Sequence, residues 1–365
     1  MKIPLIVVFI LLIGGSLLTV TSTNSSVLAQ EKDSSALHHG DDGTFINSAP
    51  DFKNDVSILP LLKRYITEKR VDTMPVSEIP LAPLTAEQLQ QLPEEQDFVI
   101  RLGHSSMLMK LAGKFWLIDP VFSDRASPFS FAGPKRFHQS PIALDSLPEI
   151  EGVIISHDHY DHLDEASIKY LSDKAKHFVV PLAVDKYLKK WQVNKNHIHA
   201  LDWWQSIDIA GVRITATPTQ HFSGRGLFDK NETLWASYVI ESARSKIYFS
   251  GDSGYFDGFK EIGERLGPFD LTMIETGAYD KDWSTIHMTP EESLQAHIDL
   301  KGRQMMPVHN GTFDLAFHSW YEPLERIHKL AQASEISLLT PIMGQAISAR
   351  SEKNETTTWW RQVKS

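Results

Sequence analysis

The sequence SHDHYDHLD at positions 156–164 places several side chains with metal-binding chemistry close together. His157 and His159 are two residues apart directly after the apolar run 153–155, so an extended backbone would direct both imidazoles to the same side. Two imidazoles on one side of a strand end can bind one divalent cation. The motif therefore predicts one part of a metal site.

The same motif supplies a second pair of ligands. Asp161 and His162 follow where the chain is expected to turn into a helix capped by Asp164, so they point to a second position close to the first. A lone histidine is most often an ordinary core or surface residue. Three histidines and an aspartate in one short motif after a strand instead predict half of a two-metal centre.

Three more side chains with metal-binding chemistry stand at the ends of other apolar runs, and they are His221, Asp252 and His309. The glycines of the GDSG sequence at 251–254 let the backbone approach closely, so the carboxylate of Asp252 can lie between two cations. Each of these residues alone would be an ordinary polar residue at a strand end. Their order after the histidine motif favours one shared centre.

Composition limits the chemistry that this centre can have. The chain of 365 residues contains no cysteine, which excludes disulfides, thiolate nucleophiles and sulfur ligands, so any metal must bind to His, Asp and Glu. Its formal net charge of −10 leaves no basic stripe for phosphates along a nucleic acid, and no nucleic-acid partner is expected.

The pattern of apolar residues predicts a mixed α/β protein. Short β-branched or aromatic runs end in loops that contain His or Asp, and we expect strands at 98–100, 115–118, 152–156, 212–217, 246–250 and 305–308. Helices are expected between them at 165–172, 290–300 and 321–331. The strands should therefore deliver the candidate ligands at their ends.

The amino terminus is typical of a targeting segment. Lys2 precedes an apolar run at 3–20, and Val27-Leu28-Ala29 is a plausible cleavage site, so residues 1–29 are interpreted as a signal peptide. Because the run is almost long enough to span a bilayer, an uncleaved membrane anchor is the alternative. Either interpretation predicts an exported protein that is periplasmic, secreted or membrane-anchored.

Two further segments precede the expected catalytic strands. Residues 30–50 are polar and rich in Ser, Asp and Gly, which is typical of a flexible linker without chemistry. Residues 51–97 contain short helical pieces broken by prolines and are expected to form an N-terminal arm that covers the sheet, although contact with lipid is the alternative. We take 51–365 as one hydrolase domain that includes this arm.

The order of the candidate ligands resembles that of a known family. His-x-His-x-Asp-His, followed by one His, one Asp and one His, is similar to the metallo-β-lactamase superfamily, whose fold is a four-layer αββα sandwich. Within it the chain resembles the branch of phospholipases D that hydrolyse N-acylphosphatidylethanolamine. This resemblance covers about 98–344, and its motifs include LGHSS at 102–106, DPVF at 119–122, RASP at 125–128, GPKRF at 133–137, LDWW at 201–204 and HMTPEE at 287–292.

The resemblance implies a ligand scheme with two metal ions and a hydroxide between them. The first ion would be bound by His157, His159, His221 and Asp252. The second would be bound by Asp161, His162, Asp252 and His309. Nitrogen and oxygen ligands suit Zn²⁺, with iron or manganese as alternatives.

Two candidate catalytic residues follow from the same resemblance, Asp161 and His287. Asp161 would act as a metal ligand, and His287 would contact the reacting group or the leaving oxygen. A histidine that begins a helix can equally be a capping or packing residue, so both interpretations of His287 remain open. No protein nucleophile is required, because two cations lower the pKa of a bound water and neutralise charge that develops on the substrate.

The substrate-binding candidates combine aromatic and basic groups. The segment 125–137 contains three phenylalanines together with Arg125, Lys135 and Arg136, which could accept acyl chains and pair with a lipid phosphate. Tyr160, inside the histidine motif, is the fourth candidate. The alternative is a structural loop whose cations only pack along the surface.

The predicted function is hydrolysis of N-acylphosphatidylethanolamine-like phospholipids to an N-acylethanolamine and phosphatidic acid. Hydrolysis of a lactone, β-lactam or thioester is the first alternative, because the same two-metal chemistry attacks carbonyls. A non-catalytic, exported metal-binding envelope protein is the second alternative. That alternative predicts a missing ligand, and every ligand position of the pattern is filled.

Overall fold

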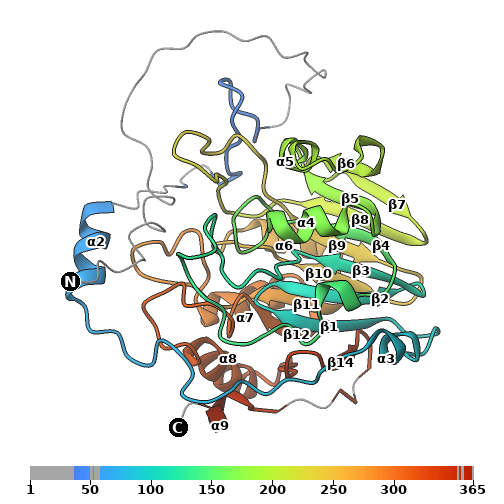
Figure 1. The fold of residues 1–365 in the computed structure, drawn as a ribbon. Helices are drawn as coiled ribbons and strands as arrows, with labels where there is room; N and C mark the ends of the chain where they lie inside the picture. Colours follow the sequence, from blue (N-terminus) through green and yellow to red (C-terminus); the bar gives the residue numbers. More distant parts are fainter. Residues whose placement is uncertain (1–36, 50–51, 53–57, 352, 355–356, 364–365) are drawn as a thin grey trace.

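Two seven-stranded sheets lie face to face in the computed structural model, which describes residues 37–49, 52, 58–351, 353–354 and 357–363 (Figure 1). The first sheet has the strand order β14-β1-β2-β3-β4-β5-β6 and the second the order β13-β12-β11-β10-β9-β8-β7. Helices cover the outer face of each sheet. The expected four-layer αββα sandwich is therefore confirmed.

The first sheet is built mainly from the amino-terminal half of the chain. Its strands are β1 (Phe98–Gly103), β2 (Ser106–Leu111), β3 (Lys114–Ile118), β4 (Ile150–Ile154), β5 (Ala175–Pro181), β6 (Ile198–Leu201) and β14 (Ala346–Ser348). The second sheet contains β7 (Ser206–Ile209), β8 (Val212–Thr217), β9 (Ser237–Glu241), β10 (Lys246–Phe249), β11 (Phe269–Glu275), β12 (Gly302–Val308) and β13 (Ser337–Leu338). All the strands expected from the sequence are present.

The helices expected at 165–172, 290–300 and 321–331 are present, together with others, among the α-helices of the described part of the chain. These α-helices are α2 (Ile58–Thr67), α3 (Ala86–Gln90), α4 (Glu165–Leu171), α5 (Asp185–Lys190), α6 (Gly258–Arg265), α7 (Pro290–Asp299), α8 (Glu322–Ala333) and α9 (Trp360–Val363). The expected cap is confirmed, because the Asp164 side chain accepts a hydrogen bond from the amide of Ala166 at the start of α4. No helix in the described part of the chain combines the length and the apolar character needed to cross a bilayer.

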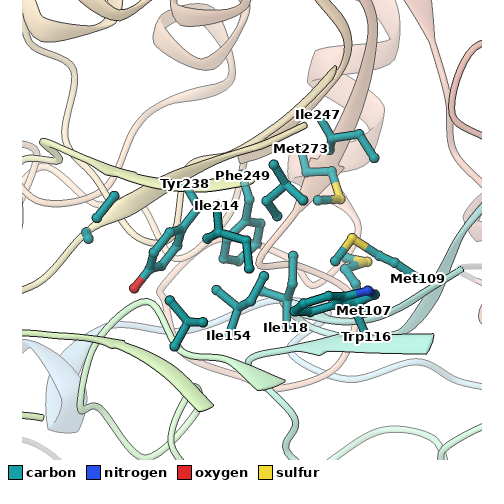
Figure 2. Packing of buried hydrophobic residues seen from close by; sticks show 14 of the residues in the cluster. Met107, Met109, Trp116, Ile118, Ile154, Ile214, Tyr238, Ile247, Phe249 and Met273 are labelled. Atoms are coloured by element: carbon teal, nitrogen blue, oxygen red, sulfur yellow. The ribbon is translucent and has the colours of Figure 1, made fainter. Parts of the chain in front are cut away.

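The main core lies between the two sheets and fixes their distance (Figure 2). Trp116 and Ile154 from the first sheet face Phe249 and Ile214 from the second, and all four side chains are fully buried. Gly152 is paired with Trp116 across β3 and β4, and a Cβ atom at position 152 would lie 2.4 Å from the indole ring. Trp116 is a principal anchor of this core, since truncation of such a buried aromatic costs about 3–5 kcal/mol.

Two further apolar clusters join the helices to the sheets. Ile168 of α4 and Leu188 of α5 pack on the outer face of the first sheet. Phe259 of α6, Leu294 of α7 and Ile327 of α8 pack on the outer face of the second. Both sheets are thus held on two sides, which makes them rigid supports for the loops at their edges.

The segment 37–49 differs from the flexible linker expected at 30–50. The side chain of Phe45 is buried in the main core, and the amide of Phe45 donates to the carbonyl of Asn231 over 2.8 Å. The amide of Ile46 donates to the carbonyl of His38 over 3.0 Å, which closes a turn. One buried aromatic residue thus ties a polar, glycine-containing segment to the domain. Residues 1–29, expected as a signal peptide or anchor, and residues 30–36 of the linker lie outside the described residues.

The N-terminal arm packs on the first sheet and also on loops beside the strand ends. Leu89 of α3 packs with the cluster on the outer face of the first sheet, as expected for the arm. Leu61 of α2 instead packs on Phe222, Trp283 and Phe317, which belong to loops beside the strand ends. The arm therefore reaches the edge of the sandwich where the candidate ligands lie.

Candidate metal centre

The candidate ligands meet because their strands end at one edge of the sandwich. β4 leads to the histidine motif, β8 to His221, β10 to Asp252 and β12 to His309. β10, β11 and β12 are parallel, and β8 runs in the same direction because β9 is antiparallel to both β8 and β10. Carboxyl ends of such strands share one sheet edge. Side chains far apart in the sequence are thereby brought within contact distance.

The first cluster contains His157, His159, His221 and Asp252. Their ligand atoms all lie within 4.8 Å of one another. His159 Nδ1 lies 2.9 Å from His157 Nε2 and 3.2 Å from His221 Nε2. Asp252 Oδ2 lies 3.7 Å from His157 Nε2 and 3.8 Å from His221 Nε2. This is the group of residues expected around the first metal.

The second cluster contains Asp161, His162 and His309, together with a residue not expected there, His104. Asp161 Oδ2 lies 3.3 Å from His309 Nε2 and 3.6 Å from His162 Nε2. His104 Nε2 lies 3.0 Å from the same carboxylate oxygen and donates a hydrogen bond to it. The expected residues of the second site are therefore together, with one additional imidazole.

Asp252 connects the two clusters. Besides its contacts in the first cluster, its Oδ1 lies 3.1 Å from His162 Nε2 and its Oδ2 lies 3.1 Å from His309 Nε2. The side chain is only 2% exposed. A single carboxylate is thus placed between two groups of imidazoles, as the sequence predicted for a bridging ligand.

Several ligand histidines are oriented by a hydrogen bond at the other ring nitrogen. His162 Nδ1 donates to Asp119 Oδ2 over 2.7 Å, and His221 Nδ1 donates to the carbonyl of Ile286 over 3.1 Å. Asp119 is itself held by the amide of Ser156 at 2.7 Å. Such partners fix the tautomer and leave a lone pair on Nε2 for a metal. The geometry therefore suits neutral imidazole ligands.

The charge balance of the centre also suits cations. Burial would raise the pKa of Asp161 and Asp252, but neighbouring histidines hold both well below the ordinary value. Burial would lower the pKa of His309, but Asp252 and Asp161 raise it to about 10. Without a metal, Asp252 and Asp161 thus favour the protonated form of the buried His309 imidazole. A metal cation can replace that positive charge.

Unsatisfied polar atoms point to the same conclusion. His162 Nε2 and Asp252 Oδ1 are buried without a hydrogen-bond partner although they are 3.1 Å apart. A buried polar atom without a partner is costly, and a cation that both atoms coordinate would remove this cost. The buried clusters are therefore able to hold two metal ions.

His104 was missed as a site residue although the motif that contains it was recognised. It follows β1 at the same sheet edge, with a backbone φ of 50°. Its amide donates to Thr312 Oγ1 over 2.6 Å, and its carbonyl accepts from the amide of His309 over 3.2 Å. Its position at a strand end, as for the other ligands, was the signal that could have identified it.

His287 lies at the centre rather than only at a helix start. A ligand atom of His287 lies within 4.8 Å of ligand atoms of Asp252 and His309. Its Nδ1 donates to Glu275 Oε1, and its side chain is 13% exposed. The cap of α7 is supplied by Thr289, not by His287. The capping alternative is thus wrong, and the position agrees with contact to a reacting group.

The four substrate-binding candidates are not all at one surface. Tyr160 and Arg125 line a cavity of about 770 Å³ beside the histidine motif. Lys135 is exposed, and its backbone pairs with that of Arg125. Arg136 is buried, and its guanidinium donates over 3.3–3.4 Å to the carbonyls of Val121 and Phe122. Contact between Arg136 and a lipid phosphate, as expected from the sequence, conflicts with this burial.

Within the two clusters, His159 is the one ligand that is not fully enclosed, and His287, which lies beside Asp252 and His309, is also partly exposed. The ring of Phe222 contacts His159 with 4.5 Å between ring centroids. Phe222 belongs to the apolar cluster that includes Leu61 of α2 and Trp283. A buried apolar cluster from loops and the N-terminal arm therefore packs against His159 at the metal centre.

The fold and the centre define a metal-dependent hydrolase of the metallo-β-lactamase superfamily, and the chain belongs to this superfamily. A model of the "Beta-lactamase superfamily domain" matches residues 116–310, which span the histidine motif and His309.

The relatives extend the match to almost the whole chain. An uncharacterized protein of Mycobacterium tuberculosis is 38% identical over 88% of this chain and 86% of its own length. The N-acyl-phosphatidylethanolamine-hydrolyzing phospholipase D 1 of Caenorhabditis elegans is 36% identical over 74% of this chain and 80% of its own length. The outer membrane protein RomA of Klebsiella pneumoniae is 53% identical over 26% of this chain and 70% of its own length. The predicted resemblance is confirmed.

Solved structures agree on the fold. The metallo hydrolase Igni18 of Ignicoccus hospitalis has a TM-score of 0.54 at 20% identity and covers 69% of this chain and 97% of its own. An isothiocyanate hydrolase from Delia radicum gut bacteria has a TM-score of 0.55 at 20% identity, with 69% and 99% covered. These likenesses support the sandwich architecture.

Asp252 is predicted to be necessary for both metal positions. The Asp252→Ala variant should lose two metal ions per chain relative to the wild type, because one carboxylate contacts both groups of imidazoles. Elemental analysis of the purified proteins measures this loss. Asp208→Ala, an exposed aspartate paired with Arg213 on β7 and β8, serves as the control. Loss of only one ion in Asp252→Ala would contradict the bridging position.

His104 is predicted to position Asp161. Removal of a group that orients a metal ligand lowers metal affinity by roughly 10–100-fold, so His104→Gln should weaken the binding of one of the two ions by that factor. Competition with a chromophoric chelator measures the affinity. His297→Gln is the matched control, since His297 is equally buried but bonds to Thr272 away from the centre. If His104→Gln binds zinc as tightly as the His297→Gln control, His104 does not position Asp161 and has only a packing role.

Proposed function

We propose that the protein is a dinuclear zinc phosphodiesterase that hydrolyses N-acylphosphatidylethanolamine or a related phospholipid. The observation that carries this proposal is the 36% identity with the C. elegans phospholipase D over most of both chains. The buried clusters of this chain, which can hold two metal ions, are compatible with that activity. The expected products are an N-acylethanolamine and phosphatidic acid.

Zinc is proposed because of the ligand types. The clusters offer imidazole nitrogens and carboxylate oxygens only, a set that is common at zinc sites. Two bound zinc ions would lower the pKa of a bound water towards neutrality and neutralise negative charge on the attacked phosphate. The residues of the chain determine where this chemistry takes place.

Each residue of the centre has a proposed role in this reaction. The first ion would be held by His157, His159, His221 and Asp252. The second would be held by Asp161, His162, Asp252 and His309. Asp161 would act as a metal ligand, and the hydrogen bond from His104 keeps its carboxylate in place.

His287 is proposed as the residue that contacts the phosphate or the leaving oxygen. Glu275 accepts the hydrogen bond from its Nδ1, so Nε2 is the nitrogen available to the substrate. Burial lowers the pKa of His287 to about 4, so the ring is neutral at pH 7. The neutral ring then presents the lone pair of Nε2, which can accept a hydrogen bond or a proton from an O–H or N–H group at the reacting centre without repelling either cation.

The surroundings of the centre support an amphiphilic substrate. Phe222, which packs with Leu61 and Trp283 in a buried apolar cluster, contacts the partly exposed His159. Exposed aromatic residues also stand on the loops around the cavity at Tyr160, and these are Phe129, Phe131 and Phe228. Apolar groups at these positions can contact acyl chains or a lipid surface.

Export is proposed on the basis of the amino-terminal sequence. A signal peptide or anchor at 1–29 would place the enzyme near envelope lipids, and the name of the K. pneumoniae relative, outer membrane protein, is compatible with that location. Mass spectrometry of the mature chain tests the proposal: a chain that starts near residue 30 supports cleavage, an intact Met1 in a membrane fraction supports the anchor, and a soluble cytoplasmic pool contradicts both.

The proposed reaction can be tested with isotope-labelled water. In H₂¹⁸O the purified enzyme should cleave N-acylphosphatidylethanolamine and place one ¹⁸O atom in the phosphate of phosphatidic acid, because water attacks phosphorus and the P–O bond to the ethanolamine oxygen breaks. Mass spectrometry of both products measures the label. Asp252→Ala should be inactive, whereas the Asp208→Ala control should retain full activity.

Two outcomes would contradict the phospholipase assignment. Label in the N-acylethanolamine would show attack at carbon instead of phosphorus. Turnover of a long-chain lactone or thioester with no detectable phospholipid cleavage would assign the centre to carbonyl substrates. The two-metal hydrolase would remain in that case, with a different substrate class.

A further inference from the structure

A second group of metal-binding side chains lies outside the dinuclear centre. His38 Nε2 is 2.6 Å from Asp202 Oδ1, and His39 Nε2 is 2.8 Å from Asp202 Oδ2. The three ligand atoms all lie within 4.8 Å of one another. No residue of this group belongs to either cluster of the dinuclear centre, so the group is separate from that centre.

Two consecutive histidines can reach one carboxylate only if the backbone departs from a regular extended strand. Side chains of neighbouring residues in a strand point to opposite sides. Here the chain turns, with the amide of Gly40 donating to the carbonyl of Thr44 and His39 paired with Phe45. The imidazoles consequently meet with 4.5 Å between ring centroids, and each directs Nε2 to a different oxygen of Asp202.

The three side chains are held in place by the core beneath them. The ring of His38 stacks on Trp203 with 4.2 Å between centroids, and the indole of Trp203 donates to the carbonyl of Trp235 over 2.7 Å. Asp202 Oδ1 accepts from the amide of Trp203 over 2.8 Å. The side chains of His38, His39 and Asp202 are only 11%, 10% and 17% exposed. The group is therefore largely preformed, which lowers the entropic cost of binding a ligand.

We propose that His38, His39 and Asp202 form a third metal site that binds one divalent cation of the zinc type. Two imidazoles and one carboxylate are a known set of metal ligands, and water can complete the coordination. Burial would raise the pKa of Asp202, but His38, His39 and the amide of Trp203 keep it below the ordinary value, so the carboxylate is ionised at neutral pH. The site would be structural, because His38 and His39 tie their segment to Asp202.

This site would stabilise the dinuclear centre through the segment that carries it. Asn47, on the same segment, donates from Nδ2 to the carbonyl of His221 over 2.7 Å and accepts from the amide of His221 over 3.0 Å. Asn47 Oδ1 also accepts from the indole of Trp235 over 3.2 Å. A cation that ties His38 and His39 to Asp202 thus keeps Asn47 against the loop of His221, a ligand of the first cluster.

Hydrogen bonds alone give the competing explanation. If Nε2 of each imidazole carries a proton, both rings donate to the carboxylate, and the distances are accounted for without a metal. The two explanations differ in the number of ions that the protein binds. Zinc titration of metal-free protein separates them directly.

The experiment uses the mature chain without a histidine tag. The protein is stripped with a chelator, incubated with Zn²⁺, desalted to remove weakly bound ions and analysed for zinc per chain. The wild type should hold three ions, His39→Ala two, Asp252→Ala one, and the double variant none. Asp202→Asn, which keeps the shape and one hydrogen-bond acceptor, should also hold two.

The control is another histidine that lies beside a second imidazole. His199 Nε2 is 3.0 Å from His177 Nδ1, but within the described residues this pair belongs to no cluster of three metal-binding groups. His199→Ala should therefore hold as many ions as the wild type. A matching loss in this control would show that zinc was binding to surface histidines without selectivity.

The outcomes distinguish the third site from the dinuclear centre. Two ions in the wild type with none in Asp252→Ala would overturn the third site and leave the dinuclear centre standing. One ion in the wild type that disappears in His39→Ala would support the third site and contradict the dinuclear one. If His39→Ala fails to fold, Asp202→Asn and the wild-type count still decide the question.

Discussion

The burial of one carboxylate between two groups of imidazoles is the constraint on which the site depends. Asp252 is 2% exposed and has oxygen atoms 3.1 Å from both His162 and His309. A buried charge is tolerated only when it is paired or coordinates a metal. The surrounding residues supply that compensation, and two cations would complete it. The position of this side chain therefore determines how the other ligands must be arranged.

The sandwich satisfies this constraint by its topology and by supporting hydrogen bonds. Strands from both sheets end at one edge, so their loops deliver ligands to a common point, and the core around Trp116 and Phe249 keeps the sheets from shifting (Figure 2). Asp119 orients His162 from one side, and Asn47 holds the loop of His221 from the other. The ligands are thus preorganised by groups that do not bind the metals themselves.

The fold and the main ligands were predictable because their signals are local. The histidine motif follows an apolar strand, and Asp252 stands between glycines, so both could be recognised from neighbouring residues. His104 shares their position at a strand end, but its contact with Asp161 depends on the pairing of His104 with Asn310 in the loop after β12. His38 and His39 escaped prediction because Asp202 is distant in the sequence and is reached only when Phe45 packs into the core. These relationships arise from tertiary contacts, which local patterns do not encode.

The substrate candidates show the same limit. The sequence groups Arg125, Lys135 and Arg136 within one short segment, but their environments differ: Arg125 lines a cavity, Lys135 is exposed, and Arg136 is buried against backbone carbonyls. A basic residue in a motif can thus have a structural role.

The most direct test of the central claim, that Asp252 lies between two metal ions, is an anomalous-scattering map of zinc-loaded crystals. The account predicts two peaks about 3.5–4 Å apart on either side of Asp252. A single peak beside Asp252, or none there, would contradict it.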